Sequence, residues 1–76
     1  MEVRAELGID QSELAEEARL KQPTISKIEN GHRVSEHSAL QVFYAVNRLR
    51  AARGWSALEF DEIRWNLRHT HEGDDE

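Results

Sequence analysis

Apolar side chains recur along this chain at the three- and four-residue spacings of helices, and no stretch shows the alternation typical of a strand. The pattern is clearest in residues 10–31, where a tight turn separates two short apolar stripes. A longer stripe follows, and Gly8, Gly31 and Gly54 mark the ends of helices. The pattern predicts five helices, at residues 1–7, 10–18, 22–30, 36–53 and 57–68. We therefore expect an all-α fold, a compact five-helix domain over residues 1–68.

The two helices within residues 10–31 carry their own start and stop signals. Asp10 is a good N-cap, and Glu13 stands three residues on, where a capping box places its carboxylate. Pro23 falls in the first turn of the second helix, where a missing N–H costs little. Gly31 can end that helix in the left-handed conformation. These local signals predict two helices joined by a tight turn.

The second helix of this pair exposes polar side chains between its buried positions. Ile25 and Ile28 form the predicted buried edge. The intervening residues are polar, face outward and do not pair with one another: Gln22, Thr24, Ser26 and Lys27. A helix that presents amide, hydroxyl and ammonium groups on one side is suited to contact a polar partner.

The C-terminal part of the domain carries a second capping-box signature. Ser56 and Glu59 have the required spacing and predict the helix at residues 57–68. The face of this helix is broad and aromatic for so small a domain, with Trp55, Phe60 and Trp65. These aromatic side chains are expected to be either core residues or part of a homodimer contact.

The last eight residues differ in character from the rest of the chain. Residues 69–76 are polar and acidic without an apolar anchor, and we expect them to form a disordered acidic tail. His69 and His71, followed by acidic residues, have the ligand types for a metal ion. Two histidines in a flexible tail are nevertheless weak evidence, and we predict no metal site.

Composition restricts the classes of function. A chain of 76 residues allows one domain with one small core, and the absence of cysteine excludes disulfides, thiolate metal sites and cysteine nucleophiles. No apolar run approaches the roughly 20 residues of a membrane span, and the N-terminus lacks a signal-peptide core. We therefore expect a cytoplasmic protein. No Ser–His–acid or paired-carboxylate arrangement stands out, so we predict neither an enzyme nor a cofactor.

The charge distribution is more informative than the formal net charge of -5. The segment from Arg19 to Arg53 holds seven basic and two acidic side chains, a net charge of +5. The acidic residues are concentrated before it and in the tail. Four of the arginines are expected to form either a solvated face or a phosphate track, namely Arg33, Arg48, Arg50 and Arg53. A basic central segment flanked by acidic residues suits a DNA-binding domain better than an enzyme for acidic substrates.

Two strings, ELA at residues 13–15 and TISKIENG at residues 24–31, agree in spacing and residue type with one known family. Together with Arg4, Gly8 and Gln11 they make residues 3–54 similar to the Cro/repressor-type (XRE-like) helix-turn-helix family. This is the five-helix DNA-binding domain of phage repressors and many bacterial regulators. The resemblance covers about two thirds of the chain.

The resemblance implies that residues 22–30 form a recognition helix in the major groove of DNA. The residues then expected to contact bases are Gln22, Pro23, Thr24, Ser26 and Lys27. Gln22 matches the family's adenine-reading glutamine, whose amide can donate to adenine N7 and accept from N6. Lys27 falls on a further base-reading position and can donate to guanine.

The resemblance also implies contacts to the DNA backbone and one internal contact. Phosphate contacts are expected from Gln11, Lys21, Asn30 and Arg33. Gln11 matches a glutamine that clamps a phosphate and can brace Gln22. Arg4 and Glu29 match an ion pair that ties the first helix to the third.

Three positions depart from the family pattern. Arg19 stands where a turn glycine is usual, so either the turn differs or Arg19 adopts the left-handed conformation. Lys21 replaces the usual Ser or Thr cap, and Pro23 replaces a polar base-reading residue. Pro23 can make only an apolar contact, for example with a thymine methyl group. The base preference of a relative therefore does not transfer to this chain.

These observations favour a sequence-specific DNA-binding transcription regulator, a repressor that acts by occupying an operator. A homodimer through the fifth helix would place two copies on adjacent half-sites of double-stranded DNA. The alternative is an antitoxin-type module, which binds a small protein partner and represses its own promoter. Either protein would work in a bacterial nucleoid or a phage-infected host, without a membrane partner.

Overall fold

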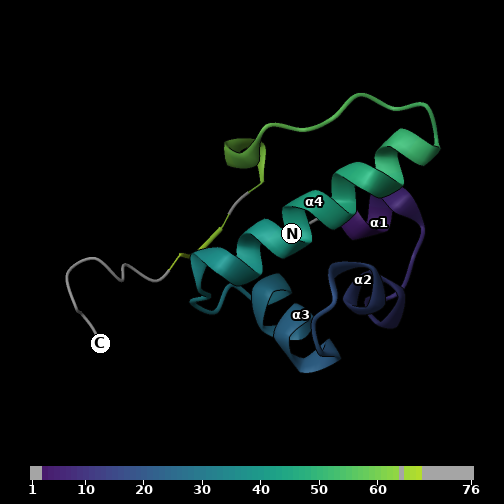
Figure 1. Cartoon of the computed structure of the whole chain (residues 1–76). Coiled ribbons are helices and arrows are strands. Elements are labelled where there is room, and N and C mark those ends of the chain that lie inside the picture. The colour runs from purple at the N-terminus through teal and green to yellow at the C-terminus, as the bar shows by residue number, and fades with distance from the viewer. Residues whose placement is uncertain (1–2, 64, 68–76) are drawn as a thin grey trace.

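The structure, a computed structural model, describes residues 3–63 and 65–67. Figure 1 shows four α-helices followed by a long segment that returns along the last of them. The helices are α1 (Val3–Leu7), α2 (Gln11–Ala18), α3 (Gln22–Glu29) and α4 (Glu36–Ala52), and a short 3₁₀ helix, η1 (Phe60–Glu62), follows. The first four predicted helices are present within one or two residues of their predicted ends, and the described part of the chain is mainly helical.

Helix α4 is the longest element, and the other helices are arranged around it. Helix α2 packs against both α4 and α3, while α1 packs against the C-terminal half of α4 (Figure 1). The largest fully buried side chains come from α2, α3 and α4: Leu14, Ile25, Val42 and Val46. The α2–α3 pair is therefore fixed on α4 by one shared apolar core. Within the described ranges no helix has the length and apolar character needed to cross a membrane.

Side-chain caps begin two of the helices where the sequence predicts them. Asp10 Oδ1 accepts a hydrogen bond from the Glu13 N–H at 2.9 Å, and Glu13 Oε1 accepts from the Asp10 N–H at 3.3 Å. This is the predicted capping box of α2. At the start of α4, Ser35 Oγ accepts from the Ser38 N–H at 3.2 Å. Lys21 precedes α3 without any side-chain cap, as its ammonium group requires.

Arg19 ends α2 in the left-handed conformation, with φ 60° and ψ 41°. The Leu20 N–H donates to the Ala15 carbonyl at 2.9 Å, and the Arg19 N–H donates to the Glu16 carbonyl at 3.2 Å. This is the capping pattern that glycine usually provides. Of the two expectations for this turn, the second holds: Arg19 adopts the left-handed conformation and carries its backbone strain.

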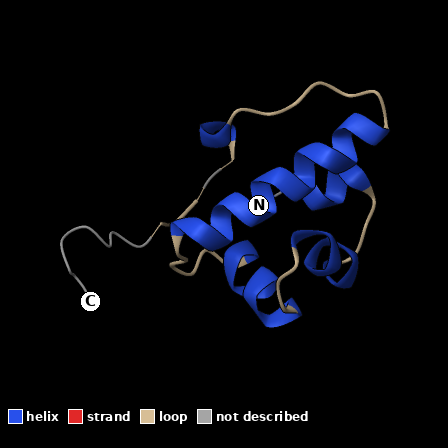
Figure 2. Ribbon diagram, viewed as in Figure 1, coloured by secondary structure: helices blue, strands red, loops and turns tan. Residues whose placement is uncertain are grey.

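The predicted helix at residues 57–68 is wrong over the part of that range that the structure describes. The chain leaves α4 at Gly54 and runs back as the extended segment seen in Figure 2, with only η1 helical. Asn47 of α4 holds this backbone, since its Nδ2 donates to the Leu58 carbonyl at 3.1 Å and its Oδ1 accepts from the Leu58 N–H at 2.8 Å. Among the described residues Ser56 caps no helix, and its carbonyl accepts from Arg50 Nε at 2.7 Å.

The returning segment ends beside the loop between α3 and α4. Val34 and Leu67 form an isolated parallel β-bridge there. The segment is anchored by aromatic packing: the Phe60 ring lies 5.3 Å from that of Phe43 and is stacked 5.2 Å from that of Trp65. Phe60 lies in η1, while Trp55 and Trp65 lie outside the helices, so the three rings do not share one fifth helix in the described residues. Whether the protein forms a homodimer stays a prediction.

Trp55 lies apart from the other two aromatic residues of the predicted face. The residue is 41% exposed, and its ring packs beside the guanidinium groups of Arg50 and Arg53, 5.4 and 5.8 Å from the ring centre. The predicted tail at residues 69–76, with His69 and His71, lies outside the described residues. In the part of the chain that the structure covers, no group of three potential metal ligands comes together.

Candidate nucleic-acid interface

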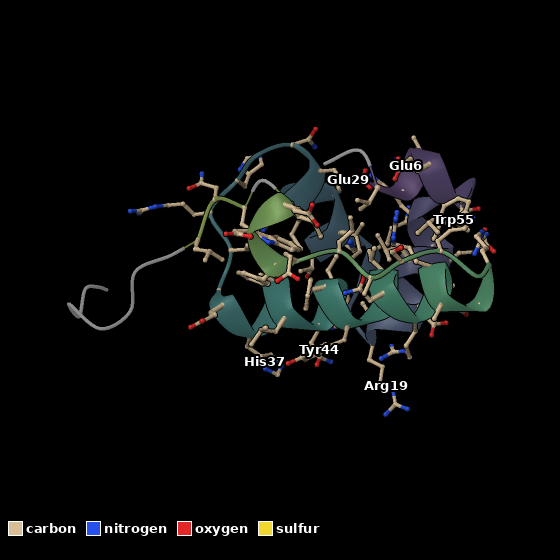
Figure 3. The ribbon with its side chains drawn as sticks, turned by 90° about the horizontal axis from the view of Figure 1, so that it is seen from above. Glu6, Arg19, Glu29, His37, Tyr44 and Trp55 are labelled. Atoms are coloured by element: carbon tan, nitrogen blue, oxygen red, sulfur yellow. The ribbon has the colours of Figure 1, made fainter. Side chains whose placement is uncertain are left out.

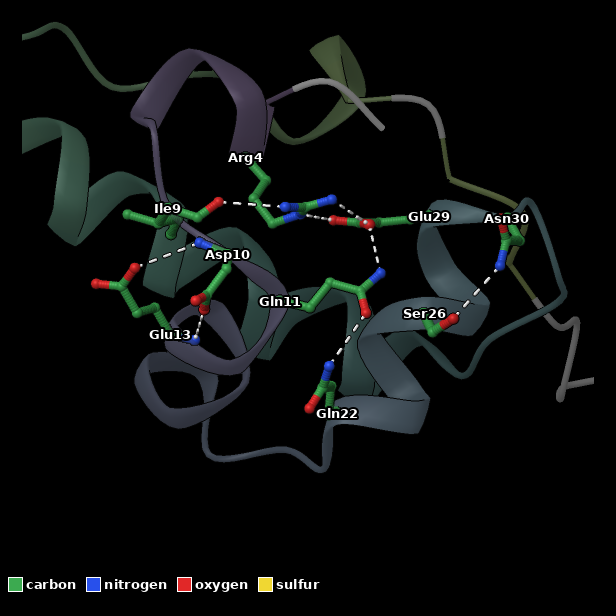
Figure 4. Close-up of polar contacts among 9 residues, drawn as sticks. All are labelled: Arg4, Ile9, Asp10, Gln11, Glu13, Gln22, Ser26, Glu29 and Asn30. Carbon is green, nitrogen blue, oxygen red and sulfur yellow. Dashed lines mark hydrogen bonds and ion pairs between the residues drawn. The ribbon is translucent and has the colours of Figure 1, made fainter.

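Helix α3 presents one continuous polar face. Gln22, Ser26 and Asn30 follow one another at single-turn intervals, as Figure 4 shows, and Pro23 and Lys27 form the adjacent row. At about 100° per residue these five positions span an arc of roughly 140°. All but the half-buried Ser26 are exposed, and Thr24 is half-buried at the edge of the arc. Ile25 and Ile28 are buried on the opposite side, so the core fixes which face of α3 points outward.

An ion pair between Arg4 of α1 and Glu29 of α3 lies behind this face. Arg4 Nη2 donates to Glu29 Oε1 at 3.0 Å, and Arg4 Nε donates to the other carboxylate oxygen. Arg4 Nη1 also reaches the Ile9 carbonyl at 3.2 Å (Figure 4). One arginine thereby ties α1, the loop before α2, and α3 together.

Glu29 is held as a carboxylate. Its side chain retains only 10% exposure, and this burial by itself would raise the carboxyl pKa. The hydrogen bonds from Arg4 and Gln11, together with the charge of Arg4, outweigh burial, so the pKa of Glu29 lies below its ordinary value. At neutral pH this side chain can therefore only accept hydrogen bonds.

The charge of Glu29 sets the orientation of two glutamine amides. Gln11 Nε2 donates to Glu29 Oε1 at 2.8 Å, which turns Gln11 Oε1 toward α3. Gln22 Nε2 then donates to Gln11 Oε1 at 3.4 Å, and Gln22 Oε1 accepts from Ser12 Oγ at 3.4 Å. Because a carboxylate cannot donate, the opposite orientation of either amide would leave an acceptor facing an acceptor.

We call the contacts that run from Arg4 through Glu29 and Gln11 to Gln22 the glutamine relay. It uses one of the two N–H groups of the Gln22 amide and one of the two acceptor positions of its carbonyl oxygen. One donor and one acceptor remain on the exposed end of Gln22. A neighbouring donor and acceptor on one planar group match the major-groove edge of adenine.

The basic side chains fall into two groups. Lys21, Lys27 and Arg33 are exposed, and none takes part in the ion pairs formed among the described residues. Arg48 and Arg50 of α4, and Arg53 directly after it, instead make contacts within the fold. Arg48 contacts the side chain and the carbonyl of Glu17, Arg50 pairs with Glu6, and Arg53 donates to the Leu7 carbonyl at 2.8 Å. Arg48 and Arg53 are exposed although they make these contacts, and Arg50 is half-buried. Whether these three arginines form a solvated face or a phosphate track stays a prediction.

Arg19 does not belong to the polar face of α3. Viewed from above in Figure 3, Arg19 and Tyr44 lie on the side of α4 opposite Glu29. Arg19 therefore affects the interface through the backbone conformation of the turn before α3. Its guanidinium group points away from the polar face of α3.

The C-terminal end of α3 forms a corner with exposed polar groups. Gly31 has φ +79°; its N–H donates to the Ile28 carbonyl at 3.2 Å, and the His32 N–H donates to the Lys27 carbonyl at 2.9 Å. Asn30 is exposed, and its Nδ2 donates to Ser26 Oγ at 3.4 Å. Arg33 follows on the same loop and is also exposed.

Two side chains that contact this site were not predicted from the sequence. Ser12 contacts the Gln22 amide, and Asn66 Nδ2 donates to the Gly31 carbonyl at 2.8 Å. Ser12 could have been found from its place in the first turn of α2, next to Gln11. Nothing local indicates Asn66, because it reaches the corner only through the path of the segment after α4.

The matches with known proteins agree with this geometry. The family model described as Helix-turn-helix matches residues 1–41, more than half of the chain. The match includes α1, α2, α3 and the start of α4, and with them every residue of the glutamine relay. No curated protein and no solved structure matches the chain. The family is regulatory and is not typically enzymatic. The chain thus belongs to the Cro/XRE-like helix-turn-helix family and is a DNA-binding transcription regulator.

Proposed function

We propose that this protein is a sequence-specific repressor that places α3 in the major groove of an operator. The observation that carries the proposal is the glutamine relay. It leaves the exposed end of Gln22 with one donor and one acceptor in fixed positions. A preorganised amide loses little rotamer freedom on binding, so it can discriminate between bases more strongly than a freely rotating side chain.

Gln22 is assigned to an adenine, donating to N7 and accepting from N6. Lys27, exposed one turn and a half further along α3, is assigned to a guanine O6 or N7. Pro23 lies between them and offers only an apolar surface, which suits a thymine methyl group. Thr24 and Ser26 complete the face with hydroxyl groups that can bond to a base or a phosphate.

The residues around this face are assigned to the DNA backbone. Gln11 and Lys21 lie at the N-terminal ends of α2 and α3, where the partial positive charge of a helix favours a phosphate. Asn30 and Arg33 lie at the other end of α3. These contacts would fix the register of the protein on the duplex without reading sequence.

The described residues contain no second domain that could sense an effector, and occupancy of the promoter is the mechanism that this fold can provide on its own. Two copies on half-sites about 34 Å apart would give a palindromic operator. A dimer is proposed here without a defined surface, because the fifth helix that would have formed it is not present in the described part of residues 57–68.

The test is replacement of Gln22 by Ala. Binding to the selected operator should weaken by about 1–3 kcal/mol, whereas binding to a duplex of random sequence should change little. Equal losses on the two duplexes would contradict the base-reading role.

Two replacements of basic residues, one within the proposed interface and one outside it, give a matched comparison. Lys27→Ala removes a cation from the proposed interface and should weaken binding and its salt dependence. Arg48→Ala removes a cation that pairs with Glu17 within the fold, and should leave both unchanged. An equal effect of the two replacements would place the interface elsewhere.

An antitoxin-type function is the second candidate, and one observation favours it. Phe60, Ile63, Trp65 and Leu67 line an open, largely apolar groove together with Asp61. Phe60, Trp65 and Leu67 are only half-buried there. Apolar surface that is left partly open is common where another protein docks. Joint expression with a small protein encoded next to this gene should yield a stable complex if this function holds. Separate elution of the two proteins would exclude that partner.

A further inference from the structure

The segment that returns along α4 ends against the corner at the C-terminal end of α3. Asn66 makes two contacts there: its carbonyl accepts from the Val34 N–H at 2.8 Å, and its side-chain Nδ2 donates to the Gly31 carbonyl at 2.8 Å. Val34, which is buried, and Leu67 form the parallel bridge beside these bonds. Asn66 therefore holds the loop of residues 31–34 at both of its ends.

Apart from the contacts with Asn66, the backbone hydrogen bonds of this loop lie at its start. The Gly31 and His32 N–H groups bond to carbonyls of α3, which fixes only the start of the loop. Arg33, between His32 and Val34, is exposed and makes no ion pair among the described residues. The direction in which Arg33 leaves the surface is thus set by how Gly31 and Val34 are held.

The segment is itself well anchored, so it can hold the loop rather than follow it. Ile63 is 5% exposed, and Trp65 Nε1 donates to the Phe60 carbonyl at 2.8 Å. The Phe60 ring packs edge-on against Phe43 of α4 and is stacked with the Trp65 ring. Asn66 follows directly after this aromatic anchor.

We propose that Asn66 is a positioning residue for DNA binding, which holds the loop of residues 31–34 so that Arg33 and Asn30 meet the phosphate backbone. The proposal rests on the function proposed above, in which these two residues contact phosphates. It assigns to the C-terminal segment a part in DNA affinity, although the described residues of that segment form no hydrogen bond or ion pair with the proposed base-reading residues.

The experiment compares Asn66→Ala with Gln41→Ala. Both side chains donate from an amide to a carbonyl at the C-terminal end of a helix, Asn66 to Gly31 at α3 and Gln41 to Ala18 at α2. Binding to a fluorescent duplex of random sequence is measured over a range of salt concentrations. Because the Asn66 side chain is exposed, its truncation leaves the core intact.

Asn66→Ala should weaken binding about fivefold, the change that corresponds to one ordinary hydrogen bond. It should also reduce the slope of log affinity against log salt concentration by about one, which corresponds to the loss of one phosphate contact. Gln41→Ala should keep the full slope. Amide exchange of Val34 and His32 should be faster in Asn66→Ala and unchanged in Gln41→Ala. A merely structural role of Asn66 would lower stability without altering the salt slope.

A double-mutant cycle with Arg33 decides whether Asn66 acts through the loop. Arg33→Ala should lower the slope by about one, and adding Asn66→Ala should then weaken binding less than it does in the presence of Arg33. Effects of the two replacements that multiply, or an unchanged slope for Asn66→Ala alone, would overturn the proposal. Absence of binding by the unmodified protein at low salt would instead overturn the proposed function, so the two failures are distinguishable.

Discussion

The α2–α3 pair and the segment that follows α4 are held in place by different kinds of contact. In the pair, the helix ends are fixed by bonds between residues two to five positions apart, such as Asp10 with Glu13 and Leu20 with Ala15. In the segment, the bonds join distant parts of the chain, such as Asn47 with Leu58 and Asn66 with Gly31. The pair forms the proposed interface, and the segment supports it from behind.

A small domain can thus combine a helix pair fixed by local contacts with a non-helical segment fixed by contacts to distant residues. The capping box of α2, the hydrogen bonds of the turn at Arg19 and Leu20, and the core shared by α2 and α3 position Gln22 at the start of α3. The segment has no such local preference and takes the path that α4 side chains impose on it. Its stability should therefore be lower than that of the pair and should depend on single side chains.

The largest effect is expected within the pair. Replacing Glu29 by Gln removes the charge that Arg4 and Gln11 bind, and should lower the free energy of unfolding by about 2–3 kcal/mol at neutral pH. Because the pKa of Glu29 is lowered in the folded state, its contribution is complete above the ordinary glutamate pKa. It is lost as the pH falls through the folded-state value, which lies below the ordinary one.

Denaturant unfolding of the two proteins at several pH values measures this contribution. Effects of the other carboxyl groups are shared by both proteins and cancel in the difference. The difference between wild type and Glu29→Gln should shrink in acid. A difference that stays constant as Glu29 becomes protonated would mean that the lost stability comes from packing and not from the ion pair.

An intermediate effect is expected in the segment. Asn47→Ala leaves the Leu58 N–H and carbonyl without their partners and should cost about 1–2 kcal/mol, since Leu58 is only half-buried. Asn47→Asp keeps the acceptor for the Leu58 N–H and should cost less. Amide exchange should become faster at Leu58 and stay slow at Leu20 in α2. Equal acceleration at both amides would show that the two regions unfold as one unit.

The smallest effect concerns the turn of the pair and has the opposite sign. Arg19→Gly relieves the left-handed strain of a residue with a Cβ atom, and should stabilise the protein by about 0.5–1 kcal/mol after the entropy of glycine is counted. Gly54→Ala is the matched change at the end of α4, where φ is +75° and an added methyl group would meet nothing within 4 Å. Thermal unfolding should show a gain for the first and a loss for the second. A loss for Arg19→Gly would mean that the arginine side chain stabilises the turn.

The sequence was sufficient for the region whose signals are local. Asp10, Glu13, Pro23 and Gly31 predict the ends of α2 and α3, and the spacing of Ile25 and Ile28 predicts which face of α3 is buried. The orientation of the Gln11 and Gln22 amides could not be predicted from the residues alone. It depends on the distance between α2 and α3 and on the carboxylate behind them.

The region after α4 could not be predicted for a physical reason. Ser56 and Glu59 have the spacing of a capping box, yet a short helix gains little on its own. The Asn47 amide satisfies both backbone groups of Leu58 in an extended conformation, and Arg50 binds the Ser56 carbonyl. These contacts link residues on different elements, so tertiary bonding overrides the local helix signal there.

The role of the glutamine relay, presenting Gln22 to a base in the major groove, can be tested on DNA of every sequence at once. Bound duplexes are selected from a randomised library at two salt concentrations, with wild type and Gln22→Ala side by side. Wild type should select a short motif with an affinity that falls as salt rises, and the preference at one adenine position should be lost in Gln22→Ala. Binding without an enriched motif, or the same motif from both proteins, would contradict this role of Gln22.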